Sequence, residues 1–215
     1  SSVPVVAPQD TPPPPTRFAH AEYFDSDPGW EHPGGEATVE DSVLQLEPEY
    51  GYPENTVLSV APWPMTTGHL KSRARAVSSS NPDYWQNAEL VFDYRDAQNY
   101  KFAGLRVGGG NWVIGVVEDG TRTMLVKAAD SGLQVDRWYA LELVVGRDEV
   151  TLYADNQSVV SWQPGGGRRI TGGQVGLMAE RGKAEFQELE QWDVGQGHNN
   201  ELRSTQRARW QRIKA

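Results

Sequence analysis

The sequence predicts an all-β protein, built as a two-sheet antiparallel β-sandwich or jelly roll, and three observations support this prediction. From Phe18 to about Val194, short apolar segments recur at roughly 8- to 12-residue spacing, with turn-forming residues between them. Asp119-Gly120 separates two of these segments, and this dipeptide favours the tight turn that matches the twist of paired strands. No part of this region has apolar residues at helical spacing over the length of a helix. Such a pattern is typical of many short strands in two packed sheets.

The first expected strands are recognised by their boundaries and by alternation. Residues 42–47 form a short apolar segment bounded by Gly and Pro, as a strand should be. Residues 68–77 alternate strictly, which predicts a half-buried strand with a solvated basic face. The two sides of that strand are Leu70, Ser72, Ala74 and Ala76, and then Lys71, Arg73 and Arg75.

The later strands are expected in pairs, because polar or Gly-containing turns separate them. The expected pairs are 89–94 with 100–107 around the polar turn 95–99, 112–118 with 122–127 around Asp119-Gly120, and 138–145 with 150–154 around 146–149. Residues 158–162, 173–178 and 184–194 complete the expected strands. We therefore place one sandwich domain at residues 18–194.

The two ends of the chain differ from this body. Residues 1–17 are expected to be an extended arm, because their six prolines favour polyproline-II backbone. In the tail, residues 195–215, Asn199 or Asn200 can cap a helix, and the basic residues that follow suit its C-terminal end. The tail is thus predicted to form a short basic helix. The residues expected to dock on a partner protein, or on an anionic membrane surface, are Arg203, Arg207, Arg209, Trp210, Arg212 and Ile213.

Composition narrows the classes of partner and compartment. The 215 residues are 38% hydrophobic and 23% charged, which suits a folded globular domain. The net charge of −9 argues against binding to DNA or RNA, whose phosphates an acidic body repels. The absence of cysteine excludes disulfides and thiolate metal sites. The Pro-rich start at Ser1 leads us to expect an extracytoplasmic protein, periplasmic or secreted, whose signal peptide has been removed.

Several segments resemble concanavalin A-like and laminin-G-like domains, including bacterial domains related to 3-keto-disaccharide hydrolases. The segment from Glu89 to Phe102 is similar to that family's "strand, D-x-x-N-Y-Y, strand" hairpin. The other similar segments are Asp136–Leu143 with Val150–Asn156, Gly173–Leu177 with Ala184–Phe186, and Tyr23–Asp25 with Trp30. Asn156 stands where the family pattern usually has glycine. The resemblance covers residues 20–194 and implies the concanavalin A-like fold, which hosts lectins, glycosidases, adhesion modules and spacers.

The sequence carries no motif for catalysis, so we expect a protein that is not an enzyme. Glycosidases of the family that it resembles place carboxylates at alternate positions of one strand as E-x-D-x-E, a pattern that is absent here. The nearest candidates, Glu188 and Glu190, are expected on a solvated face of a terminal strand. The four histidines are not at metal-ligand spacing and are expected on the surface or in loops: His20, His32, His69 and His198.

No cofactor is expected, although the resemblance leaves room for one structural calcium ion. The family often holds calcium through acidic side chains near both ends of the domain. Asp25, Asp27 and Asp193 are the corresponding candidates, provided that the fold brings them together.

Exposed aromatic residues are the other candidate site, because a flat ring with a polar edge can stack on a sugar. Tyr50, Tyr52, Tyr84 and Trp85 lie in two expected loops and form the candidate ligand face. Our leading hypothesis is a non-catalytic accessory or structural subunit of an extracytoplasmic protein assembly, docked through its terminal arms. The alternative is a carbohydrate-binding, lectin-like module, and the third is an enzyme that acts on glycosides.

Overall fold

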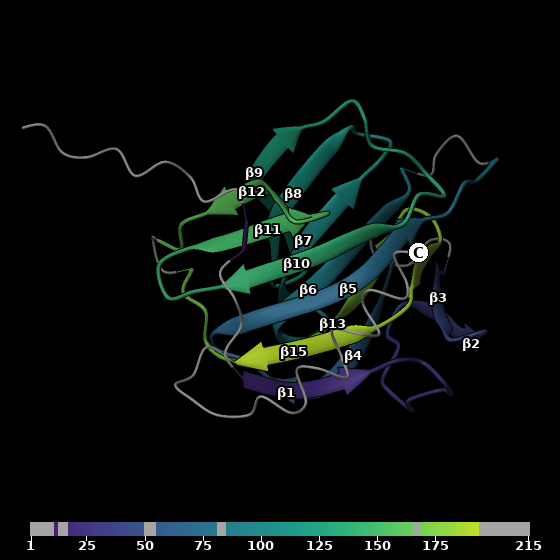
Figure 1. Ribbon diagram of the computed structural model, residues 1–215, viewed down its shortest axis with the longest axis horizontal. Helices are drawn as coiled ribbons and strands as arrows, with labels where there is room; N and C mark the ends of the chain where they lie inside the picture. The colour runs from purple at the N-terminus through teal and green to yellow at the C-terminus, as the bar shows by residue number, and fades with distance from the viewer. Residues whose placement is uncertain (1–10, 13–16, 50–54, 81–84, 166–167, 194–215) are drawn as a thin grey trace, which may run out of the picture.

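The computed structural model describes residues 11–12, 17–49, 55–80, 85–165 and 168–193, and these form two antiparallel sheets packed face to face (Figure 1). The strands are β1 (Arg17–Glu22), β2 (Gly35–Glu40), β3 (Val43–Pro48), β4 (Thr56–Pro64), β5 (Gly68–Ala76), β6 (Asn87–Asp96), β7 (Asn99–Arg106), β8 (Asn111–Glu118), β9 (Thr121–Ala129), β10 (Tyr139–Val145), β11 (Val150–Ala154), β12 (Gln157–Trp162), β13 (Gln174–Glu180), β14 (Ala184–Phe186) and β15 (Leu189–Asp193). Within these described ranges, no helix is long and apolar enough to cross a membrane.

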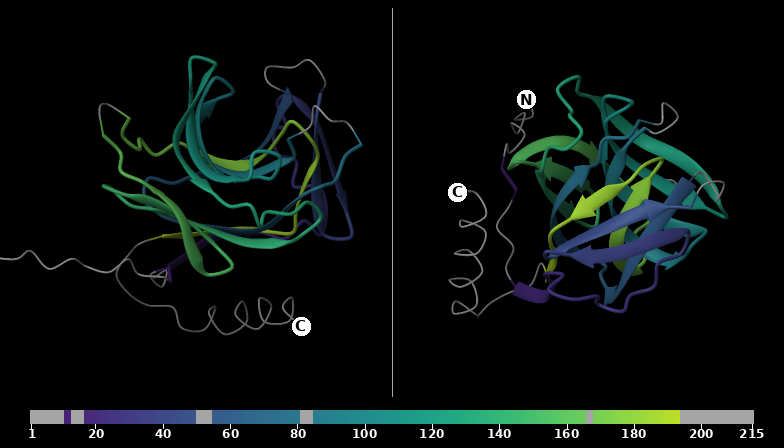
Figure 2. Two further views of the ribbon diagram at one scale, coloured as in Figure 1. Left: turned by 90° about the horizontal axis from the view of Figure 1, so that it is seen from above. Right: turned by 90° about the vertical axis from the view of Figure 1, so that its right-hand side faces the viewer.

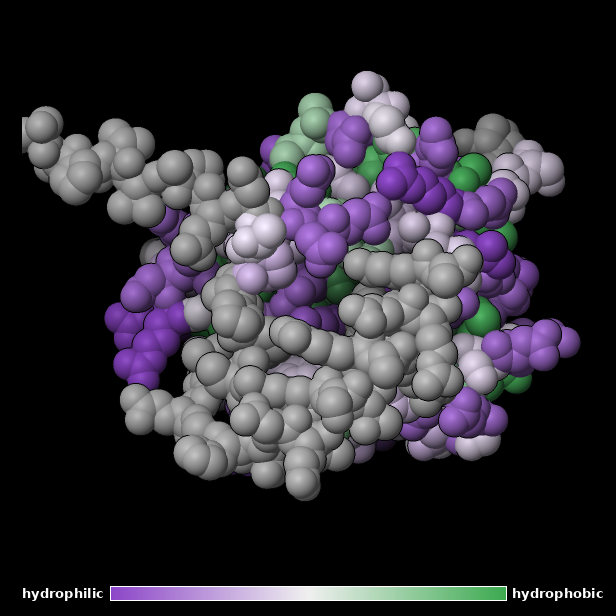
Figure 3. Space-filling model, in the orientation of Figure 1, coloured by the Kyte–Doolittle hydropathy of each residue, from purple (hydrophilic) through white to green (hydrophobic). Residues whose placement is uncertain are grey.

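Sheet A has nine strands and divides at β5. One path runs β12-β11-β10-β5-β14-β3-β2, while β15 pairs with another part of β5 and carries β1 on its other edge. The outward side of this sheet faces the reader in Figure 3, where hydrophilic side chains predominate among the described residues. The apolar side chains of sheet A therefore point inward, toward sheet B, where they form part of the core.

Sheet B has six strands in the order β4-β13-β6-β7-β8-β9. It is curved, and its concave side is turned away from sheet A (Figure 2, left). The main core lies between the two sheets and includes Leu70 and Leu141 from sheet A and Leu90 and Ile114 from sheet B, all fully buried. Alternation along each strand of sheet B therefore sends the remaining side chains to the concave side.

The conformations of two turns account for the hairpins that they connect. Asp119 and Gly120 have φ values of 48° and 76°, so both residues adopt the left-handed conformation of a type I′ turn, as predicted. Asp155 and Asn156 do the same between β11 and β12, with φ values of 51° and 68°. Asparagine tolerates this region better than most residues, so Asn156 can take the place that glycine usually has in the family pattern.

The strand predictions are confirmed in most places and incomplete in others. β1, β2 and β4 were not predicted, and residues 184–194 form the two strands β14 and β15 rather than one. β4 contains Pro62 and Pro64, which argue against a strand in the sequence but are tolerated because β4 is an edge strand with a register shift near its end. Arg17, which the sequence analysis placed in the arm, is the first residue of β1.

Three side chains predicted to be solvent-facing are instead buried, which corrects the sequence analysis. Glu190 is 1% exposed, because its strand lies between β5 and β1 and its carboxylate accepts hydrogen bonds from Tyr23 Oη (3.0 Å) and Trp192 Nε1 (2.9 Å). Glu188 is likewise buried. His69 is also buried rather than on the surface, and its Nδ1 lies 2.7 Å from Glu142 Oε1.

Candidate functional site

The concave face of sheet B, meaning the side chains of sheet B that point away from sheet A, carries a second apolar cluster. Its members are Leu58, Val60, Val91, Tyr94, Tyr100, Phe102, Val113, Val117 and Met178, all buried. An ordinary two-sheet sandwich needs only one core between its sheets. A second cluster with three aromatic rings on the opposite side of sheet B therefore needs an explanation other than sandwich packing.

Two glycines make space for large side chains on the concave face. Gly115 pairs with Phe102, and a Cβ at Gly115 would lie 2.2 Å from the Phe102 ring. Gly104 pairs with Glu89, and a Cβ at Gly104 would lie 2.3 Å from the backbone oxygen of Ala88. The Phe102 ring therefore lies against the backbone of β8, where any larger residue would displace it.

An arginine–glutamate network lies beside these rings. Glu180 Oε2 accepts hydrogen bonds from Arg106 Nη2, from Arg122 Nη1 at 3.0 Å and from Asn87 Nδ2 at 3.1 Å. Arg106 Nε lies 3.6 Å from Glu89 Oε1. Four strands contribute these side chains, namely β6, β7, β9 and β13. Because Glu89 and Glu180 are almost fully buried, the arginines offset the cost of holding their charges away from water.

Arg122 shows how strongly sheet B is curved. It comes from β9, one edge strand of the sheet, yet its Nη2 donates a hydrogen bond of 3.1 Å to Thr56 Oγ1 on β4, the other edge strand. On the way its guanidinium lies over the Phe102 ring, with Cζ 4.6 Å from the ring centroid. Arg122 therefore crosses the concave face and covers part of its aromatic floor.

Trp85 lies at the end of this face where Arg106 and Glu180 are found. It is the one large hydrophobic side chain among the described residues that is well exposed, at 44%. The guanidinium of Arg181 lies over its ring, 5.1 Å from the centroid, and Arg181 follows Glu180 in the chain. The backbone amide of Gly108, just beyond the end of β7, donates to Trp85 O at 2.7 Å. Trp85 is thus exposed, as predicted, and the structure adds that it adjoins the charged network.

The other predicted ligand-face residues, Tyr50, Tyr52 and Tyr84, lie outside the described residues. Their neighbours in the chain can still be placed. Arg181 N donates to the carbonyl oxygen of Asn55 at 2.9 Å, and Gln86 N donates to the carbonyl oxygen of Arg181 at 3.0 Å. Asn55, Gln86 and Arg181 therefore lie together at one end of sheet B.

The opposite end of sheet B is closed by a buried ion pair. Asp93 accepts hydrogen bonds from Lys101 Nζ, from Thr171 N at 2.9 Å and Oγ1 at 2.7 Å, and from Gly173 N at 3.2 Å. Burial alone would raise the pKa of Asp93, but the hydrogen bonds from Lys101 and Thr171 outweigh it and hold that pKa below its usual value. Asp93 therefore anchors the segment before β13.

The concave face does not carry the alternating row of carboxylates that glycosidases with this fold use. On β6 the concave positions are Asn87, Glu89 and Val91, so Glu89 has no carboxylate two residues away on either side. Asp93 has a φ of 51°, and its carboxylate binds Lys101 and Thr171 instead. The carboxylates that meet here, Glu89 and Glu180, come from different strands and are joined by Arg106.

The predicted calcium ligands do not come together. Asp25 accepts from Ser42 Oγ, Asp27 accepts from Gly29 N, and Asp193 pairs with Arg17. Across the ranges that the structure describes, no group of three or more His, Asp or Glu side chains is arranged to hold a metal ion. Asp25, Asp27 and Asp193 therefore do not form the site that the resemblance suggested, because Asp25 and Asp27 follow the end of β1, whereas Asp193 pairs with Arg17 at the start of β1.

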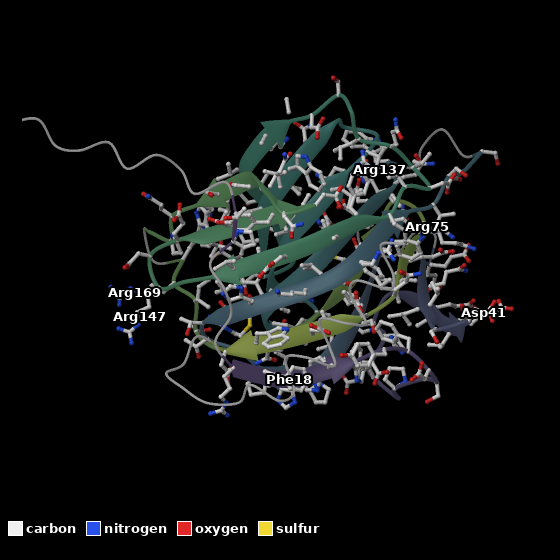
Figure 4. All side chains as sticks on the ribbon, in the orientation of Figure 1. Phe18, Asp41, Arg75, Arg137, Arg147 and Arg169 are labelled. Carbon is white, nitrogen blue, oxygen red and sulfur yellow. The ribbon has the colours of Figure 1, made fainter. Side chains whose placement is uncertain are left out.

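The predicted docking residues of the tail, Arg203, Arg207, Arg209, Trp210, Arg212 and Ile213, lie outside the described residues. Trp162 is buried in the core, whereas Trp138 is half-buried beside β5, where the guanidinium of Arg75 lies 4.8 Å from its ring centroid. Figure 4 shows Arg75 together with Phe18 on the outer side of sheet A, the side opposite the concave face.

Sequence reasoning missed the arginine–glutamate network. One signal was available, because Glu89 lies within the apolar segment Ala88–Phe92, where a charged side chain requires a partner. The partner could not be named, since Arg106, Arg122 and Glu180 come from strands whose order in the sheet the sequence does not give.

Comparison with known proteins establishes the fold. No protein-family model and no curated protein matches the sequence. The structure is similar to the carbohydrate-binding module CBM66 from Bacillus subtilis, with 17% identity, a TM-score of 0.67, and coverage of 77% of this chain and 96% of that one. It is also similar to a Bacillus subtilis protein of unknown function with a galectin-like fold, with 12% identity, a TM-score of 0.65 and coverage of 83% and 97%. A Bacillus licheniformis β-glucanase has 10% identity, a TM-score of 0.57 and coverage of 81% and 97%. The chain is therefore a concanavalin A-like jelly roll, as the sequence predicted.

Proposed function

We propose that this domain binds a carbohydrate on the concave face of sheet B, at the end where Trp85 and the arginine–glutamate network meet. The observation that supports this proposal is that Trp85, the well-exposed aromatic ring among the described residues, lies beside charged hydrogen-bonding groups at one end of the concave face. Sugars combine apolar ring faces with hydroxyl groups that both donate and accept. Aromatic side chains stack on the ring faces, and charge-assisted hydrogen bonds to Arg and Glu orient the hydroxyls. The structural similarity to a carbohydrate-binding module agrees with this proposal.

We further propose that the domain binds its carbohydrate without cleaving it. Hydrolysis needs a carboxylic acid and a second carboxylate on opposite sides of the scissile bond. Glu180 Oε2 is instead occupied by three donors, and Glu89 lies next to Arg106. These contacts are typical of carboxylates that hold arginine side chains in position. The similarity to a β-glucanase concerns the fold, since the two chains are 10% identical.

The carbohydrate proposal replaces our leading hypothesis from the sequence. An accessory subunit docked through its arms depends on residues that lie outside the described ranges, whereas the concave face is built entirely from described strands. An extracytoplasmic location, where polysaccharides are abundant, would suit a module of this kind.

Replacing Trp85 with alanine tests the proposal. We expect the affinity for the glycan to fall about 3- to 10-fold, in line with the roughly 0.5–1.5 kcal/mol that an aromatic contact contributes beyond its buried area. A glycan array that includes neutral and acidic polysaccharides would identify the ligand, and isothermal titration would then compare the variants. Because Trp85 is exposed, its removal should leave the melting temperature nearly unchanged.

Trp138→Ala is the matched control. This tryptophan also stacks against an arginine, Arg75, but it precedes β10 and lies beside Arg73 and Arg75 of β5, in sheet A. The Trp138→Ala variant should bind the glycan as tightly as the wild type does. Equal losses in the Trp85 and Trp138 variants would contradict the proposed location, and silence across the array would contradict carbohydrate binding itself.

A further inference from the structure

The charged side chains that the structure describes on the concave face do not balance. Among the described residues of sheet B that lie on this face, together with the neighbouring Arg181, four are positive and two are negative: Arg106, Arg122, Lys127 and Arg181 against Glu89 and Glu180. This local excess of two positive charges occurs in a chain whose net charge is −9. A cationic surface on an otherwise acidic protein concentrates anions and repels other acidic surfaces.

Two of these positive groups, Lys127 and Arg181, remain available to a ligand, and both lie at the borders of the concave face. Glu180 already contacts Arg106 and Arg122, and Glu89 contacts Arg106. Lys127 is exposed and forms no ion pair within the described part of the chain. Arg181 is 38% exposed, and its Nε lies 3.8 Å from Glu180, a carboxylate that it shares with two other arginines.

Strand register places these groups along one direction. Lys127 on β9 is opposite Val113 on β8, which is opposite Gly104 on β7, which in turn is opposite Glu89 on β6. In the adjacent row, Arg106 is opposite Asn87, and Asn87 is opposite Glu180, the residue before Arg181. An extended polymer lying across the strands would therefore pass Lys127, then Arg106, and end at Arg181 and Trp85.

The geometry points to a glycan that carries carboxylate groups, a polyuronate, as the ligand of this face. This inference rests on the proposed carbohydrate binding and adds the chemical class of the sugar. The fork of an arginine matches a carboxylate, and a lysine offers a point charge at the border of the face. A neutral glycan would stack on Trp85 but would leave the excess positive charge without a partner.

The test compares charged and neutral polymers. Polygalacturonate and alginate would be titrated into the protein at low ionic strength and at about 0.15 M salt, beside fully methyl-esterified polygalacturonate and laminarin, which are neutral. We expect tighter binding of a polyuronate than of either neutral polymer. We also expect its affinity to fall several-fold as the salt concentration rises, because salt screens exposed charges.

Charge-reversal variants locate the effect. Lys127→Glu and Arg181→Glu should each lower the affinity for the polyuronate about 3- to 10-fold, since each removes one attraction and adds one repulsion. Arg147→Glu is the matched control, because Arg147 is an exposed arginine in the β10–β11 turn of sheet A (Figure 4). Melting temperatures of all three variants would show that each is folded.

The outcomes separate this inference from the proposed function. Salt-sensitive polyuronate binding that weakens in the Lys127 and Arg181 variants, and not in the Arg147 variant, would support both. Binding of neutral or sulfated glycans alone, or equal effects of all three reversals, would overturn the polyuronate inference and leave carbohydrate binding standing. Binding to none of these polymers and to nothing on the glycan array would overturn both.

Discussion

Replacing Glu180 with glutamine is expected to lower the free energy of unfolding by about 3–5 kcal/mol, as is usual when one partner of a buried ion pair is removed. Glu180 is 1% exposed and is the acceptor shared by Arg106, Arg122 and Asn87. Glutamine keeps the shape of the side chain but removes the charge, so two buried arginines lose a common counter-ion. Urea denaturation monitored by tryptophan fluorescence would measure the change.

The same substitution is expected to weaken glycan binding beyond its effect on stability. Arg106 and Arg122 are held across the concave face by Glu180, and Arg122 would lose one of the contacts that keep it over Phe102. Binding would be measured well below the melting temperature of the variant, so that unfolding does not contribute.

Glu118→Gln is the control for Glu180→Gln. Glu118 pairs with Arg168 at 3.3 Å, but the two side chains are 49% and 39% exposed. An exposed pair of this kind contributes about 0–1 kcal/mol. If both glutamine variants had the same free energy of unfolding, the arginine–glutamate network would not contribute to stability more than an exposed ion pair does.

Replacing Asp93 with asparagine is expected to be similarly costly, by about 3–5 kcal/mol at neutral pH, because Lys101 stays buried without its counter-ion. Asparagine is the informative substitution here, since the φ of 51° at Asp93 is better tolerated by asparagine than by most residues. The loss should come with faster hydrogen exchange at Thr171 and Gly173, whose amides donate to Asp93.

The pH dependence of this effect follows from the lowered pKa of Asp93. A carboxyl group whose pKa is lower in the folded protein than in the unfolded chain stabilises the fold at pH values above its unfolded pKa. That contribution is lost as the pH falls through the folded pKa. The stability difference between the wild type and Asp93→Asn should therefore be full at neutral pH and shrink below about pH 4.

Two further variants test whether the buried charge of Lys101 explains the Asp93 result. Asp155→Asn has nearly the same backbone conformation, with a φ of 51°, but its ion pair with Arg137 is about half exposed, so we expect a loss of about 1 kcal/mol or less. Adding Lys101→Met to Asp93→Asn should recover part of the lost stability, because no charge is then left buried. A double variant no more stable than Asp93→Asn would count against this explanation.

Much of the sandwich could be predicted because its signals are local. Alternation along residues 68–76 assigned Leu70 to the core side and Lys71 to the outer side, and the structure confirms both. Asp119-Gly120 specified a turn from two adjacent residues. Trp85 could be recognised because it lies in a polar loop, where a large apolar side chain has little to pack against.

The concave site could not be predicted from local signals. Arg122 and Thr56, which join the two edges of sheet B, are 66 positions apart in the sequence. Alternation shows which residues of one strand share a face, but it does not give the order of strands or the curvature of a sheet.

The sequence by itself therefore determined the all-β sandwich, its turns and the exposure of Trp85, because each depends on the conformational preferences of neighbouring residues. Only the tertiary structure decided that Glu190 and His69 are buried and that Glu89, Arg106, Arg122 and Glu180 meet. The physical reason is that the environment of a charged side chain is set by the strands packed beside it, and the pairing of distant strands decides which strands those are.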